Sequence, residues 1–190
     1  FYIGKFEILH NLELQTRVKK PLQVMECYWC APPPGYVKVN TDGASRGNPG
    51  QAGWGLIFRN NKCEVLGTGY GGLGIATNFF AESAAIVEAL RIAIEKGWSN
   101  LWIEADSESA MRSFQTNTVH WLLKEDWESA RGKLPNLILS VNRREVNIAA
   151  DSCSKKGSHL QKGERFWWDA KLPFNLSIEN PDSVYYRFVN

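Results

Sequence analysis

The stretch that decides the fold reads Val37-Lys38-Val39-Asn40-Thr41-Asp42-Gly43-Ala44-Ser45-Arg46-Gly47-Asn48-Pro49-Gly50. Valines alternate with polar residues at its start, which indicates a β-strand with one buried face. The strand brings Asp42 to a turn rich in Gly, Asn and Pro, and the apolar run at 54–58 predicts a hairpin. An acid beside glycines suits a metal or phosphate site. On this segment alone, a plain Asp-Gly turn is the simpler interpretation.

The composition describes an ordinary soluble globular chain. Its 190 residues suffice for one packed domain with an appendage, and 44% of them are hydrophobic. The net charge of +2 creates no global field that would attract nucleic acid, so any basic surface must be local. The longest apolar runs are far too short to span a bilayer, and we expect no membrane partner.

The four cysteines favour a reducing compartment. Cys27 and Cys30 have CxxC spacing, but no second pair or nearby histidine completes a zinc site. We therefore expect unpaired thiols in an intracellular protein, either nuclear or cytoplasmic. Separately, we expect a monomer. Because the chain begins with Phe1 rather than Met, we expect it to be part of a longer product.

Three regions are predicted along the chain. Residues 1–30 form an N-terminal extension and linker, in which 1–20 carry the spacing of an amphipathic helix, and Ala31-Pro32-Pro33-Pro34-Gly35 marks the boundary. Residues 31–157 form the domain. Residues 158–190 form a C-terminal tail that contains Phe166-Trp167-Trp168 and that we expect to pack loosely.

Within the domain, the pattern predicts three antiparallel strands, then a helix, and afterwards strands alternating with helices. The predicted strands are 36–42, 53–60, 64–70, 100–106 and 137–141, and the predicted helices are 77–96, one starting near Ser107, 119–131 and 147–157. Strand–helix–strand order implies parallel pairing across a crossover connection. The sequence therefore predicts an α/β fold with a mixed sheet.

Two carboxylates in this pattern are unusual. Glu82 falls on the apolar side of the 77–96 helix, where a lone charge is costly unless something pairs with it. An interaction with the helix dipole near its first turn is a competing explanation. Asp106 ends a strand, and Glu104 shares its face by alternation, so the pattern does not force a choice between them. The strand end favours Asp106, because sites in such sheets gather at the carboxyl ends of strands.

Four carboxylates thus stand at element ends or on an apolar face: Asp42, Glu82, Asp106 and Asp151. Four acids without a convergent His or Cys cluster favour a hard divalent cation such as Mg²⁺ or Mn²⁺ over zinc. Paired Mg²⁺ ions held by carboxylates serve in-line phosphoryl chemistry.

The motifs together resemble a type 1 ribonuclease H domain. They are Thr41-Asp42-Gly43 with Gly47-Asn48-Pro49-Gly50, Thr77-Asn78-x-x-Ala81-Glu82, Glu104-Ala105-Asp106-Ser107, and Arg144-Glu145-x-Asn147-x-x-Ala150-Asp151. The resemblance covers about residues 30–170 and is greatest to the ribonuclease H region linked to reverse transcriptases of plant LINE-type retrotransposons. Each motif alone is weakly specific, but the four in this order are highly specific.

The resemblance implies an RNase H-like fold, with a five-stranded mixed sheet and helices on both faces. It implies a metal-dependent endonuclease that hydrolyses the RNA strand of RNA–DNA hybrids, with two Mg²⁺ ions and Mn²⁺ as a substitute. The family's catalytic and metal-binding acids match Asp42, Glu82, Asp106 and Asp151, and its substrate-binding positions match Gly43, Asn48, Asn78, Ser107 and Asn147. The implied partners are the hybrid and an upstream reverse-transcriptase region of a longer chain.

Two alternatives stay open at this point. One is a catalytically decayed retroelement domain that keeps the fold and binds nucleic acid without cutting it. The other is a strand-transferase or exonuclease on the same fold. The sequence also departs from the family in two places. The connection from Val141 to Asn147 carries no histidine, where the family's fuller members have one. No cluster of basic and aromatic residues matches the family's substrate-gripping handle, and the basic residues Arg131, Lys133, Arg143 and Arg144 would either supply a smaller patch or form a solvated face.

Overall fold

The structure, a computed structural model, describes residues 23–171 and 177–189. The helix expected within residues 1–20 lies outside these ranges. The elements are β1 (Gln23–Cys27), β2 (Val37–Gly47), β3 (Gly50–Arg59), β4 (Val65–Ala76), α2 (Asn78–Glu95), β5 (Asn100–Ala105), α3 (Glu108–Gln115), α4 (Trp121–Lys133), β6 (Asn136–Val141), the 3-10 turn η1 (Arg144–Val146), α5 (Ile148–Gly157), β7 (Arg165–Trp168) and β8 (Tyr185–Val189).

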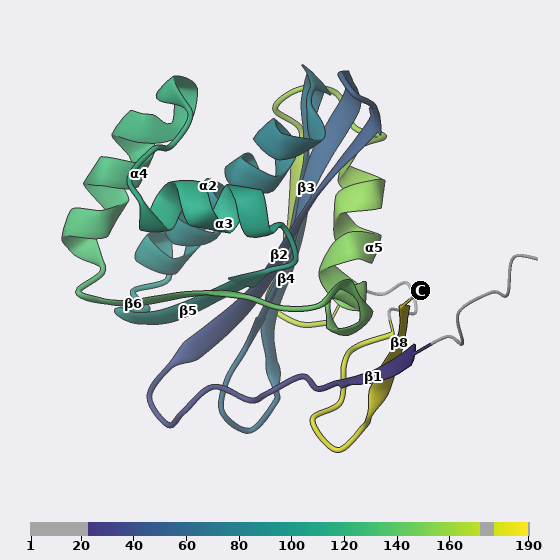
Figure 1. Ribbon diagram of the computed structural model, residues 1–190. Helices are drawn as coiled ribbons and strands as arrows, with labels where there is room; N and C mark the ends of the chain where they lie inside the picture. Colours follow the sequence, from purple (N-terminus) through teal and green to yellow (C-terminus); the bar gives the residue numbers. More distant parts are fainter. Residues whose placement is uncertain (1–22, 172–176, 190) are drawn as a thin grey trace, which may run out of the picture.

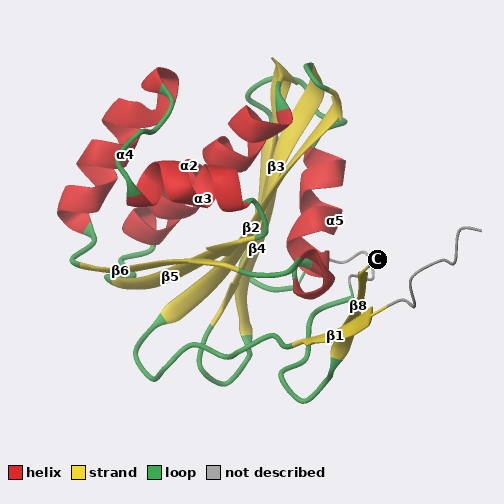
Figure 2. Cartoon of the chain, in the orientation of Figure 1, coloured by secondary structure: helices red, strands yellow, loops and turns green. Residues whose placement is uncertain are grey.

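The main sheet has the strand order β6-β5-β2-β3-β4-β7. Strands β2, β3 and β4 pair antiparallel, and β5 and β6 then add in parallel to the other side of β2. This arrangement confirms the predicted mixed sheet of three antiparallel strands followed by two parallel ones. A sixth strand, β7, pairs with β4 and extends the sheet beyond the five strands that were predicted. Figure 2 shows the strands in yellow and the helices that pack on them in red.

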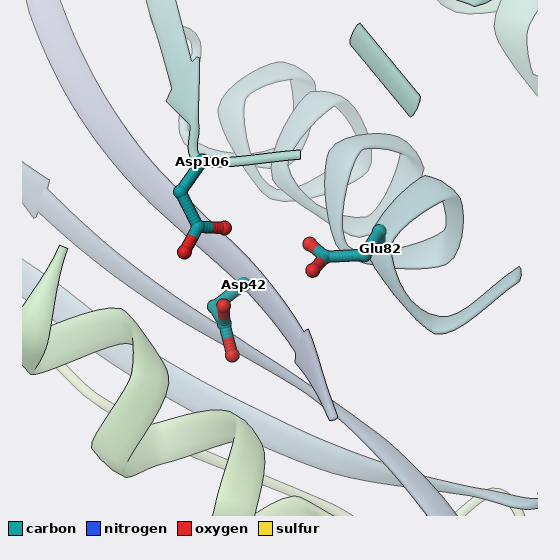
Figure 3. Close-up of side chains that lie close together, drawn as sticks. All are labelled: Asp42, Glu82 and Asp106. Atoms are coloured by element: carbon teal, nitrogen blue, oxygen red, sulfur yellow. The ribbon is translucent and has the colours of Figure 1, made fainter. Parts of the chain in front are cut away.

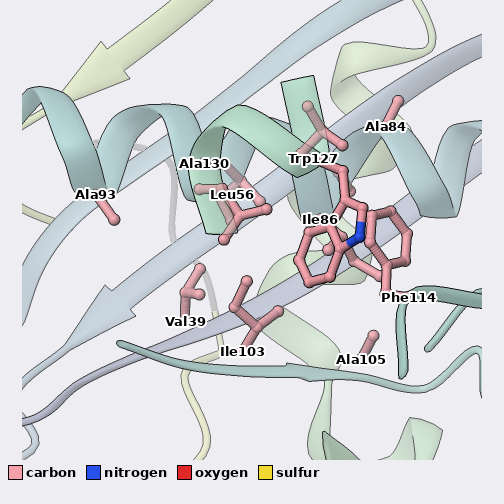
Figure 4. Packing of buried hydrophobic residues seen from close by; sticks show 14 of the residues in the cluster. Val39, Leu56, Ala84, Ile86, Ala93, Ile103, Ala105, Phe114, Trp127 and Ala130 are labelled. Carbon is pink, nitrogen blue, oxygen red and sulfur yellow. The ribbon is translucent and has the colours of Figure 1, made fainter. Parts of the chain in front are cut away.

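Helices cover both faces of the sheet, as predicted. Helices α2, α3 and α4 lie on one face and α5 lies on the other (Figure 1). The larger core fills the space under the three helices, where Val39, Leu56 and Ile103 of the sheet meet Ile86 of α2 and Trp127 of α4 (Figure 4). All five side chains are almost completely buried, so the hydrophobic effect holds these layers together.

The prediction that β2 has only one buried face is wrong. Val39 enters the core, yet Lys38 and Asn40 on the opposite face are also fully buried. The Lys38 ammonium is 2.7 Å from a carboxylate oxygen of Glu104 and 4.6 Å from the ring centroid of Trp29. Buried polar groups are stable when they are paired in this way. The second face is buried because residues before β2 cover it, which the local pattern does not reveal.

The expectation that the tail from residue 158 packs loosely is also wrong for the described residues. Strand β7 pairs antiparallel with β4, with Gly69 opposite Trp167. A Cβ atom placed on Gly67 would lie 2.2 Å from the Trp167 ring, so the missing side chain makes room for this indole. Trp167 packs against the main core, and its ring centroid is 5.7 Å from that of Phe58. The aromatic residues of the tail therefore complete the sheet.

A second, two-stranded sheet joins the two ends of the described chain. Strands β1 and β8 pair antiparallel beside the start of α5 (Figure 1). Glu179, in the segment before β8, is buried and forms an ion pair of 2.9 Å with Arg59 of β3. None of the helices in residues 23–171 is long and apolar enough to cross a membrane, and all four cysteines are free thiols.

Candidate metal centre and nucleic-acid site

The strand register brings Asp42 and Asp106 together. The last parallel pair between β2 and β5 is Thr41 with Ala105. The residue that follows Thr41 is Asp42 and the residue that follows Ala105 is Asp106, so the two aspartates lie side by side. Strand β5 ends at this pair, whereas β2 continues to Gly47. Asp42 therefore lies within β2 rather than at its end, beside the point where the neighbouring strand stops.

Glu82 reaches the same point from α2 because the helix crosses β2 at very short range. A Cβ atom on Gly43 would lie 2.1 Å from the backbone nitrogen of Glu82, so only glycine permits this approach. The backbone N–H of Gly43 donates a hydrogen bond of 3.0 Å to a carboxylate oxygen of Glu82. Thr77 caps the helix by accepting a hydrogen bond of 3.2 Å from the Phe80 backbone N–H.

Ligand oxygens of Asp42, Glu82 and Asp106 all lie within 4.8 Å of one another, and their carboxylates point toward a common centre (Figure 3). The exposed fractions of Asp42 and Glu82 are only 5% and 6%. Burial, together with the charges of Asp106 and Asp151, raises the pKa of Asp42 to about 7, although a hydrogen bond from Ser154 opposes the shift. Burial and the neighbouring carboxylates raise the pKa of Glu82 to about 9. Repulsion between buried like charges is relieved by a bound cation, and this all-oxygen set fits a hard divalent ion.

Asp151 lies beside this cluster but has different partners. Its carboxylate accepts hydrogen bonds from Arg144 at 3.2 Å and from Lys155 at 2.5 Å. It nevertheless lines the same pocket as the other three acids, which we call the carboxylate pocket, with a volume of about 320 Å³. The structure thus brings all four predicted acids to one pocket and joins three of them in a tight cluster.

The position at which β5 ends decides which of Glu104 and Asp106 points into the site. Asp106 follows the last strand residue, so alternation no longer governs its direction. Glu104 instead forms the ion pair with Lys38 and accepts hydrogen bonds from Asn40 at 3.2 Å and Asn142 at 3.0 Å. Glu104 belongs to a buried polar network, and Asp106 belongs to the site.

Four of the five predicted substrate-binding residues lie at the carboxylate pocket and an adjoining one, or next to them, and the fifth, Asn147, is buried. Gly43 and Asn78 line the carboxylate pocket, and the Asn48 side chain accepts a hydrogen bond of 3.0 Å from the Asn78 backbone N–H. Ser107 caps α3 and lines an adjoining pocket. Asn147 has no exposed surface, because its amide donates to the Thr41 carbonyl and accepts from Asn40. It supports the site from behind and cannot touch a substrate in this conformation.

Cations also line the site. None of them belongs to the predicted catalytic, metal-binding or substrate-binding residues, although Arg143 and Arg144 were candidates for a small basic patch. Arg46, Arg144 and Lys155 line the carboxylate pocket. Lys155 follows Asp151 by four residues on a helix, so helical spacing could have found it. The adjoining pocket, which we call the arginine pocket, has a volume of about 430 Å³ and is lined by Arg143, Arg144 and Arg187 among others. No local signal points to Arg187, since only the pairing of β8 brings it there.

The sheet, the helices on both faces and the carboxylate cluster beside the end of β5 define a ribonuclease H-like domain. Comparison with known proteins agrees. Residues 40–157 match the family described as reverse transcriptase-like, RVT_3, and the chain belongs to that family.

Relatives and solved structures support the same assignment. A ribonuclease H of Chromohalobacter salexigens is 38% identical over 94 residues, covering 50% of this chain and 54% of that protein. A protein of Arabidopsis thaliana, whose name marks its ribonuclease H assignment as provisional, is 36% identical over 171 residues, covering 81% of this chain and 26% of that protein. The chain thus spans about half or less of the length of these two relatives.

Among solved structures, the RNase H1 of the archaeon Halobacterium salinarum superposes with a TM-score of 0.58 at 27% identity, covering 65% of this chain and 97% of that one. LC11-RNase H1, solved in complex with an RNA/DNA hybrid, gives a TM-score of 0.57 at 27% identity and covers 65% and 96%. The predicted resemblance to type 1 ribonuclease H is confirmed at the level of the fold and the family.

Proposed function

We propose that this domain hydrolyses the RNA strand of RNA–DNA hybrids. The observation that carries the proposal is the convergence of three carboxylates within 4.8 Å, in a fold shared with an RNase H1 that was solved with such a hybrid. Cations surround this cluster, since Arg46, Arg144 and Lys155 line the same pocket. Acids that hold metal beside cations that attract phosphate suit a nucleic-acid substrate.

Two Mg²⁺ ions, with Mn²⁺ as a substitute, are the proposed cofactors. Asp42, Glu82 and Asp106 would hold them, with Asp151 at the edge of the set. When bound, such ions supply an activated water and stabilise the leaving oxygen in an in-line displacement. Calcium, whose coordination is looser, should bind without supporting comparable cleavage.

The other residues keep the acids in place and orient the substrate. The Gly43 N–H holds one oxygen of Glu82, and the Ser154 hydroxyl donates to Asp42. Asn48 and Asn78, joined by their hydrogen bond at the rim of the pocket, would contact the minor groove of the hybrid. Selectivity would come from the 2′-hydroxyls read across that groove, so the shape of the duplex counts more than its sequence.

The test is incubation of the purified protein with a labelled RNA–DNA hybrid, with and without Mg²⁺, beside duplex DNA and duplex RNA. We expect the RNA strand of the hybrid to be cut internally, and only when metal is present. The Asp42→Asn variant is the matched control, because it keeps the side-chain size but removes one ligand charge. Cleavage that survives thorough chelation would contradict the metal assignment.

A second candidate is a domain that binds nucleic acid without cutting it. One observation favours it: Arg144 and Lys155 already neutralise Asp151, and this could weaken metal binding at that carboxylate. Hybrid binding without cleavage at any Mg²⁺ or Mn²⁺ concentration would support this candidate. Restoration of cleavage in an Arg144→Gln variant would then identify the cause.

The wider setting is also part of the proposal. The reverse transcriptase-like family and the Arabidopsis relative support a domain that works beside a reverse-transcriptase region in a plant LINE-type element. We further propose a monomer in the nucleus or cytoplasm, with the catalytic domain at residues 31–157. Expression of a tagged chain, followed by fractionation and light scattering, would test the compartment and the oligomeric state.

A further inference from the structure

The arginine pocket adjoins the carboxylate pocket on the side of the C-terminal strand. Both pockets share Asn78, Glu82, Asp106 and Arg144 in their walls, so they adjoin at the acids. Arg143 comes from the connection before α5, whereas Arg187 comes from β8, far along the chain. The residues matched by the family end at 157, so Arg187 is an addition to the common domain.

The guanidinium groups of this pocket differ in how they are engaged. Arg144 donates to Asp151 at 3.2 Å. Arg187 is 4.0 Å from Glu145, in a loose ion pair whose side chains are 38% and 30% exposed. Arg143 is exposed, and its side chain makes no hydrogen bond or ion pair with the described part of the chain. Arg143 and Arg187 are therefore available to an anion.

Arg187 is held in this position by specific contacts. It lies opposite Met25 in the β1–β8 pairing, and alternation separates it from Tyr186 and Phe188, whose exposed fractions are 53% and 66%. Tyr185, which shares the face of Arg187, packs against the cluster that contains Val146 of η1. The strand thus directs Arg187 toward the site and its aromatic neighbours away from it.

Glu179 fixes the segment that leads to β8. One of its carboxylate oxygens accepts a hydrogen bond of 2.9 Å from the Ala149 backbone N–H in the first turn of α5. The other oxygen pairs with Arg59 at 2.9 Å, and both side chains are fully buried. The segment is thereby attached to the same helix that carries Asp151.

We propose that Arg143 and Arg187 form a phosphate-binding subsite that grips the backbone of a nucleic-acid strand beside the carboxylates. This inference rests on the proposed function for the identity of the strand. Guanidinium groups bind phosphate through paired charged hydrogen bonds. A phosphodiester in the arginine pocket would hold the strand in register with the carboxylate pocket, since the two pockets share four wall residues.

The test measures hybrid binding separately from cleavage, in Ca²⁺ and over a range of salt concentrations. We expect Arg143→Gln and Arg187→Gln each to weaken binding about tenfold and to reduce the salt slope by about 1. Duplex RNA and duplex DNA should lose affinity similarly, because a backbone contact does not depend on sequence. Arg187→Lys should recover most of the salt slope, and the exposed Arg112→Gln on α3 is the charge-matched control.

Two results would overturn the subsite. The variants could bind as the parent does, or they could lose thermal stability in proportion to their loss of binding. Inorganic phosphate at constant ionic strength should compete saturably with the hybrid in the parent but not in Arg187→Gln, because it would occupy the same subsite as the backbone phosphate. A parent that does not cut, with variants that still lose affinity, would leave the subsite standing and refute only the catalytic function.

Discussion

Replacing Glu179 with Gln removes a charge from the interior and leaves its partner without a counterion. The Arg59 side chain has no exposed surface and lies 3.7 Å from the ring centroid of Trp29. Burial lowers the pKa of Arg59, and the Glu179 charge opposes this shift. In the variant, the guanidinium keeps only neutral acceptors, the Asn40 side chain at 2.7 Å and the backbone carbonyl of residue 179 at 3.0 Å.

The size of the loss follows from this geometry. Removing one partner of a buried ion pair costs about 3–5 kcal/mol, because the remaining charge stays desolvated. The same change weakens the hydrogen bond that the Ala149 backbone N–H donates to the side chain of residue 179, because the acceptor loses its negative charge. For a chain of this size, each kcal/mol shifts the melting temperature by about 2–4 °C. We therefore expect the melting temperature of Glu179→Gln to fall by roughly 6–20 °C.

The assay is thermal and urea unfolding followed by circular dichroism. Glu128→Gln is the matched control, because Glu128 pairs with Lys124 at 3.9 Å while both side chains are more than half exposed. That control should change the free energy of unfolding by no more than about 0.5 kcal/mol. The double variant Arg59→Met/Glu179→Leu should be more stable than Glu179→Gln, since it leaves no buried charge unpaired.

A loss below about 1 kcal/mol in Glu179→Gln would refute the reasoning, because that is the range of an exposed pair. It would mean that the segment carrying Glu179 does not pack on Arg59 in solution. The position of Arg187 at the arginine pocket would then also be in doubt, since both belong to the same C-terminal segment.

The remaining predictions concern the carboxylate cluster. Asp42→Asn should abolish hybrid cleavage while keeping or raising the melting temperature in chelator, because it removes one of several mutually repelling buried charges; a large loss of stability would make Asp42 structural. In the parent, Mg²⁺ or Mn²⁺ should stabilise the fold by about 2.7 kcal/mol at a hundredfold excess over its Kd, an effect that unfolding scans should find much reduced in Asp42→Asn. Without metal, the stability of the parent should fall as the pH rises. The folded-state pKa values of Asp42, about 7, and Glu82, about 9, exceed the unfolded values. Their contribution is therefore complete below about pH 4 and is lost as the pH passes first 7 and then 9. Urea titrations in chelator across this range check the slope, which should flatten at its upper end in Glu82→Gln.

Much of the site was accessible from sequence because its signals are local. The helical period alone placed Glu82 among alanines, and the structure confirms that it lies on the buried side of α2. Gly43 belongs to the predicted motif of an acid beside glycines, and in the structure its missing side chain lets the backbone of α2 approach β2. The position at the end of a predicted strand favoured Asp106 as a site residue. In the structure β5 ends at Ala105, so the side chain of Asp106 does not follow the alternation of the strand.

Other features depended on contacts between segments far apart in the chain. Nothing near Asn147 indicates that it is buried, since its partners are Thr41 and Asn40, more than a hundred residues away. The polar face of β2 looked solvent-exposed because the Trp29 ring that covers it precedes the strand across a proline-rich linker. The aromatic tail looked unstructured because its place depends on the glycines of β4.

The sequence by itself determined the order of the strands and helices between residues 36 and 157, their mixed sheet and the four acids, because each follows from periodicity or turn chemistry within a few residues. Only the tertiary structure decided that three acids cluster while Asp151 is held by Arg144 and Lys155. It alone placed Glu179 on Arg59 and Arg187 beside the site. These outcomes depend on strand register and on pairing between distant segments. A local pattern cannot specify such pairing, because the same residues could satisfy it against many partners.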